Sequence, residues 1–335
     1  DWSSDVCSSD LFAFDRAGAL GNTIFIKYTI INKGEDDLQE AYVGAWADVD
    51  NGDANDDLIG FDLERGMSYC YGGKAVDATY GARPPALGWD YFQGPIIDSP
   101  GDVVELPDGR VFYDKTMLSA TSFNKYYNSH ATYRDPAYSA EGAEQVWYYL
   151  SGTQKDGTPW IDPTTEQEST FSNTGDPVTG EGWLSTNENP PADIRMLTGS
   201  GPFVIAVGDT QEIVLGCVIG QGSNRLSSIE VLRFYDQEAQ QAYDLGFQVP
   251  SPPPAPIITV SELDRKVLVQ WDNTPENFES SYEFEGYNVY IGSSGAGPWK
   301  RLATFDILND LDVILQSTYD INTGLILNMP AAYGN

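Results

Sequence analysis

A proline-rich segment is the feature that most limits how this chain can fold. Residues 249–256 read VPSPPPAP. Proline lacks a backbone N–H and holds φ near about -65°, so such a run neither continues a helix nor pairs within a central strand. We expect a semi-rigid linker at 250–256 between one domain at 12–249 and a second at 257–335. The 335 residues are enough for two domains of ordinary size.

The balance of charge excludes several classes of partner. Lys and Arg total 18 against 50 Asp and Glu, a formal net charge of -32. Such a surface repels the phosphates of nucleic acid and the anionic headgroups of membranes, so we expect no nucleic-acid partner. We also expect no membrane insertion, because no apolar stretch is long enough for a span. Hydrophobic residues make up 41% of the chain, which favours a packed fold over a disordered acidic tail.

Cysteine and histidine are too few for the common zinc and nucleophilic sites. Cys7, Cys70 and Cys217 form no disulfide framework and no C-x-x-C pair. His130 is the single histidine, which excludes a multi-histidine zinc site. Catalysis through His130 is disfavoured because no G-x-S-x-G segment is present to hold a nucleophile. A pair of catalytic carboxylates of the glycosidase type remains an alternative, since the many acidic residues could form many pairs and a sequence gives no distances between them.

The first domain has the pattern of β structure. Residues 22–32 and 41–47 are rich in β-branched and aromatic residues, and each run ends at a turn or loop. Residues 201–220 hold two apolar runs around Gly208-Asp209, which predicts two core strands joined by a tight turn. Residues 66–190 are rich in Gly, Pro, Asn and aromatics, which predicts long ordered loops. The predicted fold is all-β, a large β-sandwich with long loops and one packed helix.

The helix is predicted at 227–245. Ser227 and Glu230 have the spacing of a capping box, and Gly246 can end the helix. The apolar side chains at helical spacing are Ile229, Leu232, Tyr235, Ala239, Ala242 and Tyr243. We expect this helix to pack against the sandwich.

The second domain resembles a fibronectin type III module. The segments KVLVQW (266–271), GYNVYIG (286–292) and GPWKRLATF (297–305) resemble its strands B, C and C′. The resemblance implies that Trp271 is the buried tryptophan of strand B, with Tyr287 and Tyr290 on strand C. Closing F and G strands show no pattern before Asn335, so we expect a partial, truncated β-sandwich.

The strongest candidate site is the acidic loop DVDNGDANDD at 48–57, directly after a predicted strand. Calcium prefers six to eight oxygen ligands, which side chains at alternate loop positions can supply. We therefore expect calcium to hold this loop in a structural role. The alternative is a hydrated turn rich in Asn, Asp and Gly. The predicted ligands are Asp48, Asp50, Asp53, Asn55 and Asp57.

Two ligand registers stay open. Asp53, Asn55, Asp57, the Ile59 carbonyl and Glu64 have the spacing of an EF-hand loop, but Leu58 stands where that loop usually has glycine. The other register uses Asp48, Asp50, Asp53 and Asp57 and needs no flanking helix.

Aromatic residues in the loop-like region are the second candidate site. Trp89, Tyr91 and Trp160 could stack on sugar rings or anchor a protein partner, because a rigid aromatic side chain loses little entropy on binding. The alternative is that they pack the loops onto the core. We expect a glycan or an extracellular protein as partner.

The first eleven residues, DWSSDVCSSDL, resemble the translation of a sequencing-library adapter. We set residues 1–11 aside from the fold as a probable artefact. We therefore expect the natural N-terminus, with any signal peptide, to be missing.

Several segments together resemble one family. AWADVDNGDANDDLIGFD, PPALGWDYFQGP, TSFNKYYN, GDPVTGEGW and TGSGPFVIAVGDTQEIV are similar, in this order, to large uncharacterised extracellular proteins of bacteria that use type IX secretion. Those proteins often end in a sorting domain. The resemblance implies a secreted or cell-surface location and gives no active site. We expect a non-catalytic module for adhesion, scaffolding or substrate binding. The alternative is an accessory region of a secreted hydrolase acting on polysaccharide or protein.

Overall fold

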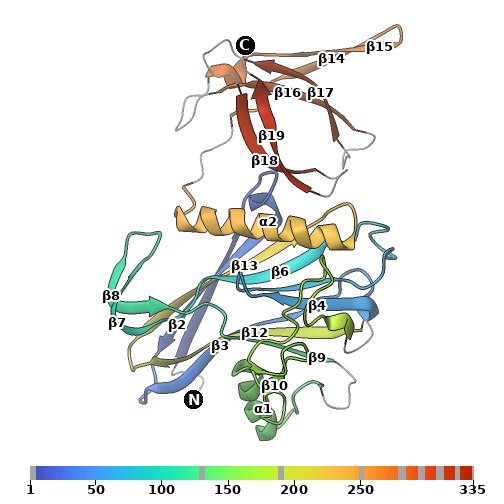
Figure 1. Cartoon of the computed structure of the whole chain (residues 1–335). Coiled ribbons are helices and arrows are strands. Elements are labelled where there is room, and N and C mark those ends of the chain that lie inside the picture. Colours follow the sequence, from blue (N-terminus) through green and yellow to red (C-terminus); the bar gives the residue numbers. More distant parts are fainter. Residues whose placement is uncertain are drawn as a thin grey trace. The chain divides into compact units, whose positions relative to one another are not determined.

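The structure is a computed structural model in which the chain divides into two compact units, Asp1–Phe247 and Gln248–Asn335 (Figure 1). The division falls beside the proline-rich segment. The described residues consist mainly of β-strands and hold two α-helices. The structure describes residues 5–127, 133–187, 192–248, 253–277, 284–292, 299–306, 313–320 and 325–333.

Six strands of the first unit form one antiparallel sheet in the order β1-β2-β13-β6-β5-β4. The strands are β1 Asp5–Ala13, β2 Thr23–Asn32, β4 Asp57–Asp62, β5 Met67–Gly72, β6 Ala86–Gln93 and β13 Thr210–Gly220. Every residue of β4 and β5 is buried. Their two faces are therefore both covered, which explains why they lack the polar-apolar alternation of a half-exposed strand.

A second antiparallel sheet has the order β3-β12-β9. Its strands are β3 Leu38–Asp48, β9 Ser122–Tyr127 and β12 Ile194–Ile205. Apolar side chains of both sheets form one cluster, in which the rings of Phe61 and Phe123 lie 5.4 Å apart. Figure 1 shows this sheet on the opposite side of the six-stranded sheet from helix α2, Arg225–Asp244. The predicted all-β sandwich is confirmed.

The turn at Gly208-Asp209 connects the two sheets. The prediction of two strands around it is confirmed, but β12 and β13 belong to different sheets and do not pair with each other. Gly208 has φ +87°, which favours glycine. Its N–H donates to the Asn32 carbonyl, and the Asn32 N–H donates to the Asp209 carbonyl. These bonds tie the turn to the end of β2.

The prediction of long loops over residues 66–190 is wrong for much of that stretch. Strands β5, β6 and β9 lie there, as does helix α1, Ala140–Leu150. Strand β9, SFNKYY, is buried throughout although it contains Asn124 and Lys125. Because polar residues are unusual in a buried strand, the sequence pattern did not predict it. The remaining strands of the stretch are β7 Ile96–Glu105, β8 Val111–Met117, β10 Trp160–Ile161 and β11 Glu168–Ser169.

Helix α2 covers part of the six-stranded sheet and has caps at both ends. The capping box is formed by Asn224 and Ser227, so the predicted pair Ser227 and Glu230 is wrong. At the other end, the Phe247 N–H donates to the Ala242 carbonyl and the Gly246 N–H to the Tyr243 carbonyl. With Gly246 at φ +62°, this is a Schellman motif, as the glycine predicts.

Residues 5–11 take part in the fold, contrary to our exclusion of residues 1–11. Strand β1 pairs along its whole length with β2, with Leu11 opposite Ile26. Leu11 is 67% exposed. The pairing rests on backbone hydrogen bonds, which an edge strand offers to an extended segment of almost any sequence.

The described residues of the second unit form three antiparallel strand pairs. Trp271 is half-buried, and its ring lies 5.5 Å from that of Tyr287 and 5.2 Å from that of Phe305. After Phe305, where the sequence shows no pattern of closing F and G strands, β18 and β19 pair with each other. The strands are β14 Ile258–Leu263, β15 Lys266–Trp271, β16 Gly286–Gly292, β17 Trp299–Asp306, β18 Val313–Asp320 and β19 Leu325–Tyr333. The short 3-10 helices among the described residues are η1 Leu20–Asn22, η2 Ala54–Asp56, η3 Ser185–Asn187 and η4 Thr274–Asn277.

Candidate functional site

The acidic loop, residues 48–57, connects β3 of one sheet to β4 of the other. The alternation of β3 continues just past its end, so Ala45, Ala47 and Val49 are buried while Asp48 and Asp50 face the surface. Strand β4 begins at Asp57, so the residues after it are extended. In an EF-hand a helix follows the twelve-residue loop, whereas here the chain enters strand β5 at Met67, shortly after Glu64. The EF-hand spacing is therefore not accompanied by EF-hand geometry.

A group of three carboxylates lies on the surface of this loop. Carboxylate oxygens of Asp48, Asp50 and Asp193 all lie within 4.8 Å of one another. Asp48 pairs with Arg195 across the β3–β12 ladder, and continuing this register places Asp50 opposite Asp193. Asp193 is far away in sequence, so only the strand pairing could have identified it.

Arg195 already neutralises part of this group. Its guanidinium lies 2.8 Å from an Asp193 oxygen and 3.2 Å from an Asp48 oxygen. Partial burial raises the pKa of Asp48, as do the neighbouring Asp193 and Asp50, while Arg195 lowers it. A cation bound to the three carboxylates would have to share them with this arginine.

Asp53 and Asn55 point to other partners. The Asp53 carboxylate accepts hydrogen bonds from the Asn55 backbone N–H and from Lys74, whose Nζ lies 2.8 Å away. The hydrogen bond from Lys74 is the main reason that the pKa of Asp53 falls to about 2. The structure therefore does not bring these two predicted ligands into the surface group.

Three buried side chains of the loop carry oxygen atoms that accept no hydrogen bond from the described residues. They are Asn51 Oδ1, Asp56 Oδ1 and Asp57 Oδ1, on side chains that are at most 3% exposed. Asp56 Oδ2 lies 3.2 Å from Lys74 Nζ. Buried oxygens normally have a partner, because removing them from water without one costs about 1–3 kcal/mol each. Asn51 and Asp56 were not among the predicted ligands.

Asp57 is the most perturbed carboxyl group of the loop. Burial raises its pKa to about 8, and repulsion from Asp56 and Asp50 adds to the effect. Hydrogen bonds from the Asn51 N–H and the Cys70 thiol act in the opposite direction. At neutral pH the group therefore holds either a proton or a cation close to it.

Asp77 closes the other side of the loop. Its carboxylate accepts hydrogen bonds from the backbone N–H groups of Thr79, Tyr80 and Asp53. Gly52 has φ +81°, and a Cβ there would lie 2.4–2.6 Å from the Asp77 carboxyl atoms. Asp77 thus fixes the bend of the loop, a role that its position outside 48–57 concealed.

The predicted stacking residues lie in strands and in the core, and not in surface loops. Trp89 and Tyr91 belong to β6 and line an apolar cleft of about 360 Å³ between the sheets. Trp89 is half-buried. Tyr91 is 6% exposed, and its hydroxyl accepts from the Ala45 N–H and lies within hydrogen-bonding distance of the carbonyls of Val43 and Thr198.

Trp160 is separate from this cleft. It is 3% exposed, and its ring lies 5.0 Å from that of Tyr133 and 6.1 Å from that of Trp183. Its indole N–H donates to the Asn124 side-chain oxygen. Trp160 therefore packs the 160–183 segment onto β9, as the alternative interpretation predicts.

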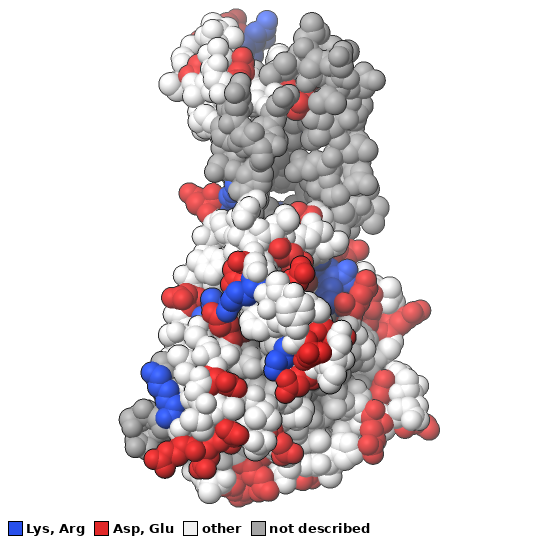
Figure 2. All heavy atoms as spheres, turned by 90° about the vertical axis from the view of Figure 1, so that its left-hand side faces the viewer, with Lys and Arg blue, Asp and Glu red and all other residues white. Residues whose placement is uncertain are grey.

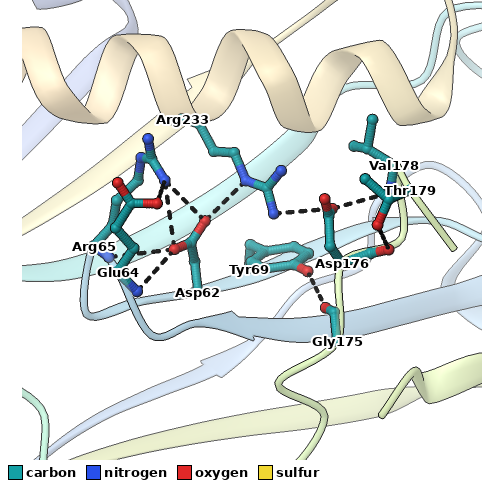
Figure 3. Close-up of polar contacts among 9 residues, drawn as sticks. All are labelled: Asp62, Glu64, Arg65, Tyr69, Gly175, Asp176, Val178, Thr179 and Arg233. Atoms are coloured by element: carbon teal, nitrogen blue, oxygen red, sulfur yellow. Dashed lines mark hydrogen bonds and ion pairs between the residues drawn. The ribbon is translucent and has the colours of Figure 1, made fainter. Parts of the chain in front are cut away.

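Ion pairs hold α2 to the sheet and the loop beneath it (Figure 3). Arg233 lies 2.8 Å from an oxygen of Asp62 and 3.0 Å from an oxygen of Asp176. Arg65 also pairs with Asp62, at 3.2 Å. Asp62 thus accepts two guanidinium groups from different elements, which makes this contact a fixed anchor.

Two further carboxyl groups, Asp90 and Asp236, are buried on β6 and α2. They are 4% and 2% exposed. Burial raises the pKa of Asp90 to about 7 and that of Asp236 to about 8, and the nearby Asp90 contributes to the second shift. Neither residue lines the cleft between the sheets or the cavity of about 370 Å³ beside α1. The pair therefore has the features of a structural contact.

The surface of the first unit is acidic. Figure 2 shows one face, on which Asp and Glu side chains are spread widely and only a few Lys and Arg lie between them. None of the helices in the described part of the chain is long and apolar enough to cross a membrane. His130 lies outside the described residues.

Comparisons with models of protein families, with curated proteins and with solved structures found no match.

Proposed function

We propose that this chain is a non-catalytic, extracellular or cell-surface binding module whose first unit is stabilised by calcium. The observation that carries the proposal is a set of buried oxygens in the acidic loop, on Asn51, Asp56 and Asp57, that accept no hydrogen bond from the described residues. Oxygen atoms of carboxylates and side-chain amides are the ligands that calcium prefers. Extracellular calcium is abundant, and the family resemblance implies that location.

A cation would resolve two features of the loop together. It would pair with buried oxygens that accept no hydrogen bond from the described residues, and it would keep Asp57 ionised although burial raises its pKa to about 8. A hydrated turn resolves neither, because these side chains are buried. The ligands of this proposal are Asn51, Asp56 and Asp57, with Asp50 close enough to affect the pKa of Asp57. Asp53 and Asn55 remain outside, since the two Asp53 oxygens accept from Lys74 and from the Asn55 N–H. Lys74 also pairs with Asp56, but through Oδ2, which leaves Asp56 Oδ1 for the cation.

Isothermal titration of the full chain with calcium tests the site. We expect saturable binding that is lost in Asp57→Asn, which keeps the size of the side chain but removes its charge. Glu64→Gln is the matched control, because its side chain is 84% exposed and only the EF-hand register needs it. Equal binding by Asp57→Asn and wild type would contradict the proposed ligands. Loss of binding in Glu64→Gln would favour the EF-hand register.

The cleft between the sheets is the candidate binding surface. Its walls are aliphatic and aromatic, with Trp89, Tyr91 and Trp46 among them, and it contains no charged side chain. A neutral sugar ring or an apolar side chain of a protein partner fits this chemistry. A glycan and matrix-protein array should show a retained ligand that Trp89→Ala loses. Trp147→Ala, at a residue of α1 that is 41% exposed and lies outside the cleft, is the control.

The rival function, an accessory region of a secreted hydrolase, requires two carboxylates that face a substrate cavity. Asp90 and Asp236 are a pair of buried carboxyl groups, but neither of them lines either of the two described cavities. We therefore favour a binding or scaffolding role. Hydrolysis of a polysaccharide or protein substrate by the chain, abolished in Asp90→Asn, would reverse this preference.

A further inference from the structure

Lys125 and Asn173 form an unusual buried pair that the calcium proposal does not use. Lys125 is 0% exposed and Asn173 is 1% exposed. The Lys125 amine donates a hydrogen bond to the Asn173 side-chain carbonyl oxygen, with 2.5 Å between Nζ and Oδ1. A lysine with no exposed surface is rare, because its ammonium loses all its contact with water.

The pairing of two segments brings these residues together. Phe123 of β9 forms a parallel bridge with Phe171. Two backbone hydrogen bonds flank this bridge, from the Phe123 N–H to the Thr170 carbonyl and from the Ser172 N–H to the Phe123 carbonyl. Lys125 and Asn173 each lie two residues beyond the bridged pair, so the same register places them side by side.

Asn173 is held in place from several sides. Its backbone carbonyl accepts a hydrogen bond of 3.0 Å from the Phe61 N–H of β4. Its φ of +53° is one that asparagine adopts more readily than most residues. The side-chain amide is therefore presented to Lys125 in a defined position.

Two tryptophans surround the amine. Lys125 Nζ lies 5.4 Å from the centre of the Trp160 ring and 5.7 Å from that of the Trp183 ring. Both rings are at most 3% exposed. Water is thus excluded from the pair, which prevents hydrolysis of the amide from competing with attack by a neighbouring amine.

From this geometry we infer that Lys125 and Asn173 join covalently in an isopeptide bond. The neutral amine of Lys125 is the nucleophile. Its lone pair attacks Asn173 Cγ, and a bond between Nζ and Cγ forms. The bond between Cγ and Nδ2 breaks, an Nζ proton passes to the departing nitrogen, and ammonia leaves. A lysine that begins as ammonium releases an ammonium ion, so atoms and charge balance without an oxidant or another reactant.

The fixed contact between the two groups raises the rate of this reaction. Amines and amides do not condense at ordinary concentrations in water, but a fixed contact between reacting groups acts as a very high local concentration. The product replaces a buried amine by a neutral secondary amide. It also closes a covalent loop between two positions that are 48 residues apart. Helix α1 and the β10–β11 hairpin lie within this loop.

The intact mass of the folded wild-type chain tests the inference directly. We expect a mass lower than that of the sequence by about 17 Da, the mass of ammonia. Proteolysis after denaturation should release a branched peptide that joins the segments around Lys125 and Asn173. An intact mass equal to that of the sequence would overturn the inference, whether or not any variant folds.

Matched variants locate the bond. Lys125→Met removes the amine but keeps most of the apolar stem, and it should restore the full mass and remove the branched peptide. Lys155→Met is the control and should keep both signatures. Succinimide formation at Asn51-Gly52 loses the same mass, so loss of mass without a branched peptide would also overturn the inference. The masses should be the same in calcium and in chelator, so failure here is distinguishable from failure of the calcium site.

Discussion

Three carboxyl groups of the first unit are withdrawn from water, and each has a raised pKa. Asp57, Asp90 and Asp236 are at most 4% exposed, and burial is the largest cause of each shift. An unfolded aspartate titrates near about 3.9. Without calcium, the folded state therefore binds more protons than the unfolded state between that pH and the folded values of about 7 to about 8. The contribution of these groups to the free energy of unfolding is therefore largest below about pH 4, and it is lost as the pH rises to about 8.

The effect of Asp236→Asn on the free energy of unfolding should depend on pH. At about pH 9 both Asp90 and Asp236 are ionised, so removing one buried charge should raise the free energy of unfolding by about 1–3 kcal/mol. At about pH 5 both groups are protonated, and the substitution should be neutral or slightly destabilising. Urea unfolding at the two pH values, with Asp98→Asn as control because its side chain is 86% exposed, measures this. The same change in stability at both pH values would show that the pair does not titrate as stated.

Tyr91→Phe tests whether Tyr91 is part of the framework. Its hydroxyl lies between backbone groups of β3 and β12, and the substitution leaves the Ala45 N–H and the Thr198 carbonyl without that partner. We expect a loss of about 1–3 kcal/mol in the free energy of unfolding. Tyr113→Phe, at a residue that is 73% exposed, should cost less than about 0.5 kcal/mol. Equal stability of both variants would show that Tyr91 is free to face a ligand.

At the scale of elements, α2 depends on Arg233 as well as on its apolar face. Arg233→Met leaves Asp62 and Asp176 without this partner. We expect a loss of about 2–3 kcal/mol, less than for a fully buried pair because Asp176 is 33% exposed. Lys115→Met is the control: its partner Asp98 is 86% exposed, so the loss should stay below about 1 kcal/mol. Urea unfolding compares the two, and equal losses would mean that the α2 anchor contributes no more than a surface pair.

Sequence patterns identified the elements that have one exposed face or clear end signals. The predicted strands 22–32 and 41–47 and the predicted helix 227–245 are of this kind. Their boundaries lie within three residues of those of β2, β3 and α2, respectively. Elements buried on both faces were missed. Strand β5 reads MSYCYG and β9 reads SFNKYY, and neither alternates, because both their faces are covered.

The candidate site was only partly predictable for a related reason. Consecutive loop residues indicate carboxylates but not the directions in which they point. The burial of Asp56 and Asp57, the capture of Asp53 by Lys74 and the approach of Asp193 all depend on contacts with distant segments. The proline run, in contrast, acts locally, and the division of the chain lies beside it.

At the scale of the whole molecule, the two units are expected to respond differently to calcium. The acidic loop belongs to the first unit. Binding to the native state alone adds about 2.7 kcal/mol of stability at about 100 times the dissociation constant. The second unit should therefore unfold at the same temperature with and without calcium, which provides an internal control within one chain.

Calorimetric unfolding of the full chain in calcium and in chelator tests the central claim most directly. We expect the transition of the first unit to rise by about 5–10 °C in saturating calcium, and Asp57→Asn to remove this rise while Glu64→Gln keeps it. An identical unfolding temperature in calcium and in chelator would contradict the proposal that the acidic loop holds a structural cation.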